Sequence, residues 1–258
     1  MLSGAMSGLK ERVSGGGKVL PQGSSGLRLQ IPPGPPGKYR LAQVDDYLGL
    51  PRNKFPWSPE LSLRWEMRAS ARESPGTWGV GFWNDPFGLA FIRGGGIRIP
   101  VLPNAAWFFV ASPQNYLSLR DDLSGNGYLA AVFRSPENLP LSLFLGLPLL
   151  PLFFLPAVAR WWRGFLRRYV KQDSCEFNLD LTEWHHYGLE WHLDGVCFLI
   201  DGQVLKEMSV YPNGKLGLVI WIDNQYASWT PAGRLKFGTL ANSLESWVEM
   251  RDLEMGFA

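Results

Sequence analysis

Alternating apolar and polar residues predict that most of the chain forms β-strands. In residues 61–68 the apolar positions are Leu61, Leu63, Trp65 and Met67, and polar residues fill the positions between them. Because successive side chains of a strand point to opposite faces, this pattern predicts a strand with one buried face. Similar short segments follow at 184–192, 196–200, 203–208, 216–223, 234–240 and 247–255, separated by turn residues. This spacing predicts an all-β, two-sheet antiparallel sandwich of the jelly-roll type.

Residues 75–87 form the most informative of the predicted strands. One face carries Trp78, Val80, Phe82 and Asn84, and the other carries Gly79, Gly81, Trp83 and Asp85. The first face has the composition of a core. The second face places two glycines beside an indole and a carboxylate, which predicts a flat floor open to close approach.

The composition changes in two places. Residues 1–38 are rich in Gly, Ser and Pro, which predicts a flexible arm ahead of a sandwich domain at 39–258. Residues 137–172 are predicted to be an insert in that domain. Its first part, 139–159, carries no charged residue and has the length of a bilayer span, but its four prolines disfavour a straight membrane helix.

The second part of the insert, 157–171, has the helical periodicity of a basic amphipathic helix. Two interpretations remain open. The helix lies at a membrane surface or forms a lipophilic lid, or it simply packs over an apolar groove of its own domain with its arginines in water. The first predicts peripheral membrane contact through 139–171, with the contacts made by Trp161, Trp162, Phe165, Arg160, Arg163 and Arg167.

Charge and cysteine content narrow the function classes. A formal net charge of +2 argues against a general nucleic-acid binder. The two cysteines and three separated histidines predict neither a disulfide framework nor a metal site, and no cofactor or partner protein is inferred. The first residues lack the apolar region of a signal peptide, which predicts a cytoplasmic location, with peripheral attachment at the inner membrane face as an option.

Several segments in this order resemble the concanavalin A-like lectin and glucanase superfamily, and within it the family 16 glycoside hydrolases. They are PGTWGVGFWNDP at 75–86, EWHHYGLEWHLDGVCFLIDGQVL at 183–205 and the closing strand at 247–255. The resemblance covers 39–135 and 173–255. It implies a jelly roll with a ligand groove on its concave sheet.

The catalytic signature of that family is absent from the matching position. The family's enzymes carry Glu-x-Asp-x-x-Glu on the strand after the tryptophan strand, which sets two carboxylates about 5 Å apart for retaining hydrolysis. The corresponding residues here, 104–113, read NAAWFFVASP and contain no acid. The resemblance therefore implies the fold and a groove, without that reaction.

Candidate site residues follow from the predicted concave sheet. The candidate acids are Asp85, Asp46 and Asp223, and the candidate ligand contacts are Trp83, Asn84, Trp107, Trp221, Asn224 and Tyr226. Each acid also has a structural interpretation. These are a turn cap before Pro86 for Asp85, a solvated pair with Asp45 for Asp46, and a plain turn for Asp223.

Two function classes remain open on these grounds. The first is a lectin-like groove that binds a saccharide, a glycolipid or another lipophilic ligand at a membrane surface without hydrolysing it. The second is an enzyme that uses the candidate acids on an isoprenoid or lipid-linked substrate. A divergent family 16 hydrolase that uses other carboxylates is a further alternative.

Overall fold

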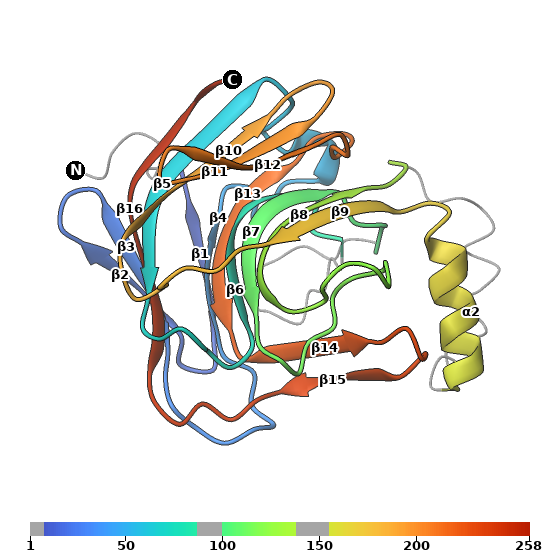
Figure 1. Cartoon of the computed structure of the whole chain (residues 1–258). Coiled ribbons are helices and arrows are strands. Elements are labelled where there is room, and N and C mark those ends of the chain that lie inside the picture. The colour runs from blue at the N-terminus through green and yellow to red at the C-terminus, as the bar shows by residue number, and fades with distance from the viewer. Residues whose placement is uncertain (1–7, 87–99, 138–154) are drawn as a thin grey trace.

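Two antiparallel sheets pack face to face in the computed structural model, which describes residues 8–86, 100–137 and 155–258 (Figure 1). The concave sheet has the order β1 (Lys10–Ser14), β4 (Leu41–Asp45), β13 (Gly217–Asp223), β6 (Thr77–Trp83), β7 (Ala105–Ala111), β8 (Gly127–Arg134) and β9 (Lys171–Glu176). The convex sheet has the order β12 (Gln203–Met208), β11 (Val196–Ile200), β10 (His185–Trp191), β5 (Leu61–Ala69), β16 (Ser246–Phe257), β3 (Gly26–Ile31) and β2 (Lys18–Gln22). The predicted two-sheet sandwich is confirmed.

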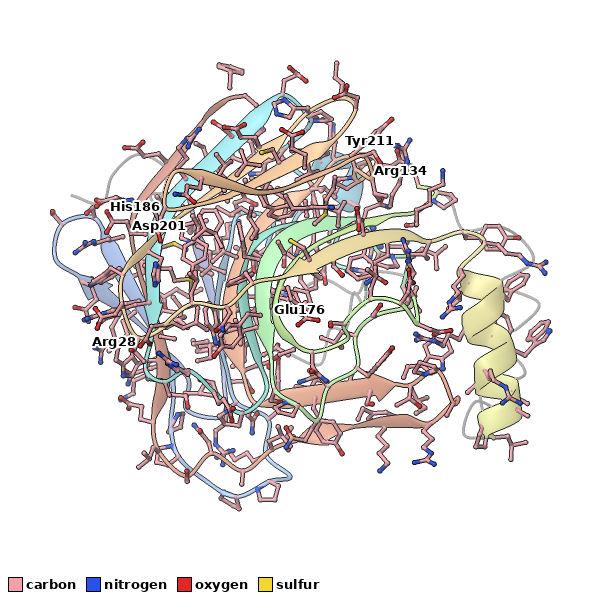
Figure 2. All side chains as sticks on the ribbon, in the orientation of Figure 1. Arg28, Arg134, Glu176, His186, Asp201 and Tyr211 are labelled. Carbon is pink, nitrogen blue, oxygen red and sulfur yellow. The ribbon has the colours of Figure 1, made fainter. Side chains whose placement is uncertain are left out.

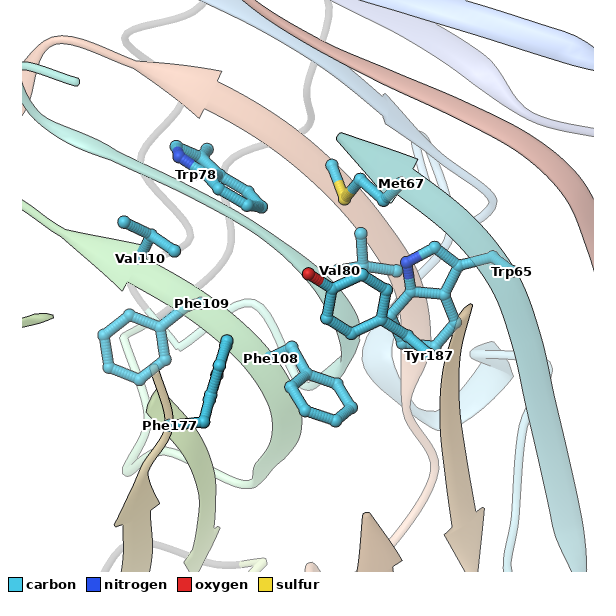
Figure 3. Close-up of a pocket in the computed structure, with 9 residues that line it drawn as sticks. All are labelled: Trp65, Met67, Trp78, Val80, Phe108, Phe109, Val110, Phe177 and Tyr187. Atoms are coloured by element: carbon cyan, nitrogen blue, oxygen red, sulfur yellow. The ribbon is translucent and has the colours of Figure 1, made fainter. Parts of the chain in front are cut away.

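The core lies between the two sheets and is built from the apolar positions that the alternation marks. It includes Leu63, Phe82, Trp191 and Phe198, all of which are fully buried. A cavity of about 10 Å³ remains inside it, lined by Trp65, Met67, Trp78, Val80, Phe108, Phe109, Val110, Phe177 and Tyr187 (Figure 3). That volume is close to the minimum for one water molecule, so the core is densely packed.

The prediction of a flexible N-terminal arm is wrong for residues 10–31. These residues form β1 at the edge of the concave sheet and β2 and β3 in the convex sheet. Strand β3 buries Leu27, Leu29 and Ile31 and pairs with β16, more than 200 positions later in the chain. The glycines that suggested flexibility supply turns, since Gly15, Gly16 and Gly23 adopt positive φ between the strands.

Three further elements stand beside the open side of the concave sheet (Figure 1). They are the helix α2 (Pro156–Leu166), the hairpin of β14 (Gln225–Trp229) and β15 (Leu235–Thr239), and the connection between β7 and β8. A short 3-10 helix, η1 (Arg52–Lys54), follows β4. The helix confirms the helical part of the predicted insert, whereas most of the apolar run at 139–159 lies outside the described residues.

Candidate functional site

Three indoles meet on the concave sheet, on the face that points away from the core. Trp83 of β6, Trp107 of β7 and Trp221 of β13 are each partly exposed, and we call them the tryptophan cluster. The Trp83 and Trp221 rings are parallel within 7° with centroids 6.4 Å apart. Trp107 lies 5.8 Å from the first and 5.6 Å from the second. The structure therefore brings together the three tryptophans singled out as a stacking surface.

The two glycines of β6 make room for these indoles. A Cβ added at Gly79 would lie 2.6 Å from Cη2 of Trp221, and one added at Gly81 would lie 2.5 Å from Cβ of Trp107. At these two glycines, β6 is thus covered by side chains from the neighbouring strands β13 and β7. The floor predicted from the sequence exists, but it is the indoles and not the glycines that face outward.

One buried polar relay holds Trp83. Its indole Nε1 donates to the Tyr47 hydroxyl at 2.6 Å, and Gln43 Nε2 donates to the same hydroxyl at 3.4 Å and to Asp45 at 2.8 Å. Asp45 is ion-paired with Arg12 of β1 at 3.2 Å. Burial raises the pKa values of the Tyr47 hydroxyl and the Asp45 carboxyl. Through its one hydrogen bond to Tyr47, the indole is thus connected to residues 43–47 and to β1.

A second relay holds Trp221. Its Nε1 donates to Thr77 Oγ1 at 2.9 Å, and that hydroxyl donates to Asp223 Oδ1 at 3.0 Å. The same carboxylate accepts from the Thr77 and Gln225 amides at 3.2 and 3.1 Å and from Tyr39 at 3.4 Å. Asp223 is 7% exposed, and burial raises its pKa to about 7. These contacts occupy both of its oxygens, so its evident role is structural.

The three candidate acids do not converge on one point. Asp223 pairs with Thr77 at one end of β6, and Asp85 follows Trp83 at the other end. The six residues between Thr77 and Trp83 span about 20 Å of strand, far beyond the separation that two carboxylates need to act on one glycosidic bond. Asp85 and Asp223 therefore cannot form the acid–base pair for one glycosidic bond.

Asp46 faces the inter-sheet side and is also a structural group. Its Oδ2 accepts from the Trp57 indole at 2.5 Å and its Oδ1 from the Leu218 amide at 2.9 Å. Burial raises its pKa to about 6. The alternative of a solvated pair is wrong as well, because Asp45 is fully buried. Asp85 adopts a positive φ of 47°, and its backbone carbonyl accepts from Arg52 at 2.6 Å.

Two of the predicted polar ligand contacts instead close loops. Asn84 donates to the Leu102 carbonyl at 2.9 Å and is 8% exposed. Asn224 is fully buried, donates to the Leu240 carbonyl at 2.8 Å and accepts from the Arg40 amide at 2.8 Å. Tyr226 lies on β14, on the hairpin outside the concave sheet. None of these three side chains is placed in the tryptophan cluster.

Strand β7 contains most of the segment 104–113, in which the resemblance led us to look for catalytic acids. Its side chains on the concave face are Ala105, Trp107, Phe109 and Ala111, which belong to one apolar cluster. No acid stands on this face of β7, all of whose residues the structure describes. The concave face of β7 is therefore apolar and aromatic along its whole length.

Helix α2 turns part of its predicted polar face inward. Arg163 is only 2% exposed, ion-paired with Asp121 at 3.1 Å, and Trp162 is 5% exposed. Arg167 also pairs with Asp121. Burial of Trp162 and Arg163 contradicts their prediction as membrane contacts in this conformation. Leu166, which ends the helix, packs into the apolar cluster that contains Trp107, as expected of a helix packed on its own domain.

The convex sheet carries a polar hollow of about 550 Å³, lined by Arg64, Trp65, Glu66, His186, Tyr187, Gly188, Leu199, Asp201, Gly202, Asp252 and Glu254. Figure 2 shows His186 and Asp201 next to each other there, and the His186 amide donates to Asp201 at 2.9 Å. Glu66 pairs with Arg251 at 2.5 Å. Within the described residues no group of three or more His, Cys, Asp or Glu side chains is arranged to hold a metal ion.

Comparison with known proteins gives likenesses of fold only. No family model and no curated protein matches the sequence. A family 16 glycoside hydrolase of Bacteroides ovatus, solved with an oligosaccharide product, covers 93% of this chain and 85% of its own at 8% identity and a TM-score of 0.48. A glycoside hydrolase family protein from Mycobacterium thermorestibile matches over 92% of this chain and 79% of its own, at 12% identity and a TM-score of 0.48. A laminarinase catalytic domain from Thermotoga petrophila matches over 92% of this chain and 79% of its own, at 8% identity and a TM-score of 0.43.

The chain is thus a two-sheet antiparallel β-sandwich, and the solved structures that it matches include family 16 glycoside hydrolases. At these identities the likeness concerns the arrangement of strands. Conclusions about a ligand rest on the chain's own residues.

Sequence reasoning missed the residues that orient the indoles. Tyr47 and Thr77 lie on the same face as the tryptophan cluster and bond to it directly. Arg12 was hidden in the segment taken for a flexible arm. The available signal was the pair of glycines in β6, because a strand without side chains next to a tryptophan indicates that bulky neighbours cover it.

Proposed function

We propose that the concave sheet binds a saccharide by stacking it on the tryptophan cluster, and that it does so without paired-carboxylate hydrolysis. The observation that carries this proposal is the convergence of Trp83, Trp107 and Trp221, each partly exposed, on one face of the sheet. Indole faces are large, rigid apolar surfaces that suit the flat C–H face of a sugar ring.

The polar surroundings of the cluster favour a saccharide over a purely apolar ligand. Thr77 of β6 is partly exposed beside it, whereas Gln43 and Asp45 of β4 are buried and orient Trp83. Ligand sites typically combine aromatic walls with a few placed polar groups, and hydroxyl groups match such groups better than a hydrocarbon chain does.

The absence of acids from the concave face of β7 supports binding without hydrolysis. Retaining glycosidases need a nucleophile and an acid about 5 Å apart, and inverting enzymes need the two within about 10 Å. The distribution of Asp46, Asp85 and Asp223 over different faces and ends of the sheet does not support the enzyme alternative either.

The proposal is tested by screening neutral oligosaccharides on a glycan array and titrating the strongest binder by calorimetry. Trp107→Ala is expected to lower affinity about tenfold or more, as expected for a central tryptophan of a binding site. Trp247→Ala, on the convex sheet, is the matched control and should leave affinity unchanged. Equal losses in both variants, or no binding by the wild-type protein, would contradict the proposal.

A glycolipid or isoprenoid ligand remains a prediction that the same titration can address. A lipid-linked sugar that binds much more tightly than its free headgroup would move the proposal toward a lipophilic ligand. Affinity governed by the saccharide alone, with Trp107→Ala still disruptive, would exclude a role for the lipid part.

A further inference from the structure

Helix α2 presents an outward surface that differs from its predicted one. Arg160 and Arg168 are exposed, and Trp161 is 60% exposed. The Trp161 and Phe165 rings stack at 5.6 Å. The outward surface of α2 and the residues just after it thus combines a large apolar ring with cations, while Arg163 faces the protein.

The hairpin of β14 and β15 continues this surface. Arg163 Nη1 donates to the Trp229 carbonyl at 2.7 Å, which ties the helix to the end of β14. Gly233, in the turn between the strands, lies against the backbone of Pro156, and Figure 1 shows the tip of the hairpin beside α2. The hairpin adds the exposed side chains of Arg234 and Lys236, whereas the exposed Phe237 follows Lys236 on the opposite face of β15.

The charge of this surface has one sign. Residues 155–172 and 224–244 contain no acid. Arg163 and Arg167 share one ion-pair partner, Asp121, which neutralises one of their two charges. Four other exposed cations lie on α2, just after it and on the hairpin, and none of them makes an ion pair with another described residue: Arg160, Arg168, Arg234 and Lys236. A cationic surface with no internal counter-charge is complementary to an anionic partner.

We propose that the α2–hairpin surface, defined by these four cations with Trp161, docks on an anionic lipid bilayer. Interfacial binding combines cations at the headgroups with aromatic side chains at the boundary of the acyl region, and this surface offers both. No described helix is long and apolar enough to span a bilayer. Docking through the surface would be peripheral and is independent of saccharide binding by the concave sheet.

The contact set differs from the one predicted from the helical wheel. Trp162 and Arg163 are not part of the proposed contact set because they are buried. The hairpin is part of it because the fold brings residues 233 and 156 together. The proposal therefore makes a claim about Arg234 and Lys236 that the sequence pattern of the helix does not contain.

Co-sedimentation of the full chain with lipid vesicles tests the proposal. Vesicles of phosphatidylcholine with phosphatidylglycerol are compared with phosphatidylcholine alone at about 0.1 M salt, where charges still act over roughly 10 Å. Preferential binding to the anionic vesicles is expected. Because each cation near such a surface contributes about fivefold to partitioning, Arg234→Gln with Lys236→Gln should lower the partition coefficient about 25-fold.

The matched control replaces two exposed lysines of the convex sheet, Lys18→Gln with Lys206→Gln, and changes the net charge equally. It should leave binding nearly unchanged. Trp161→Ala should weaken binding in high salt, where the apolar contribution dominates. Equal binding to both vesicle types, equal losses in control and test variants, or binding to RNA with none to vesicles would overturn the proposal.

Discussion

Asp223 should make the protein less stable as pH rises, and Asp223→Asn should remove that dependence. The carboxyl is buried beside Thr77 and Tyr39, and its pKa is raised from 3.8 to about 7. Its protonated form is therefore favoured in the folded state. The unfolded chain releases this proton near pH 4, whereas the folded chain keeps it until about pH 7.

The sign and size of the effect follow from this difference. The stabilising contribution of protonated Asp223 is complete below about pH 4 and is lost as pH rises through about 7. A shift of about three units corresponds to about 4 kcal/mol of unfolding free energy. Asp46, whose pKa is raised to about 6, acts in the same direction but is present in both proteins and cancels in their difference.

The assay is urea unfolding of wild type and Asp223→Asn at about pH 4 and about pH 8, followed by tryptophan fluorescence. The asparagine costs hydrogen bonds at both pH values, so only the change in the difference between the proteins is informative. We expect the advantage of wild type to shrink by about 4 kcal/mol between the two conditions. Parallel pH profiles would refute the assignment of a strongly raised pKa to this buried carboxyl.

Three further predictions follow from the packing of the concave sheet. Gly81→Ala should lower the unfolding free energy by about 1–3 kcal/mol in urea titrations, because its Cβ collides with β7. Arg163→Ala should release α2 and speed limited proteolysis near residues 155–170, whereas Arg160→Ala, which alters an exposed position, should not. Tyr47→Phe should cost about 1 kcal/mol of stability and weaken saccharide affinity, since Trp83 loses its acceptor; unchanged affinity would make the relay irrelevant to binding.

The sandwich and the face of each central strand were predictable because they depend on local alternation. In β6 the split between Trp78, Val80 and Phe82 on one side and Trp83 on the other is visible in the sequence, and the structure follows it. When a strand is buried on one face, its apolar residues recur at every second position, and this pattern identifies the buried face without knowledge of the neighbouring strands.

The failures have a common cause in long-range pairing. Residues 10–31 read as a flexible arm because their glycines and prolines dominate the local composition, and nothing local reveals their pairing with β4 and β16. Arg163 was predicted to face water or lipid because a helical wheel shows only the residues of the helix. It cannot show that the fold places Asp121 next to this arginine. Asp223 and Asn224 end a strand. Polar residues of the same types occur there whether they contact a ligand or close a loop, so the sequence could not distinguish the two roles.

The most direct test of the central claim is a crystal structure of the protein with a bound neutral oligosaccharide. The account predicts an intact sugar chain stacked on Trp83, Trp107 and Trp221, with its glycosidic bonds uncleaved after prolonged soaking. A sugar bound in the hollow of the convex sheet, with the tryptophan cluster unchanged, would contradict the proposed site. A cleaved product on the concave sheet would contradict the claim that this sheet binds without hydrolysis.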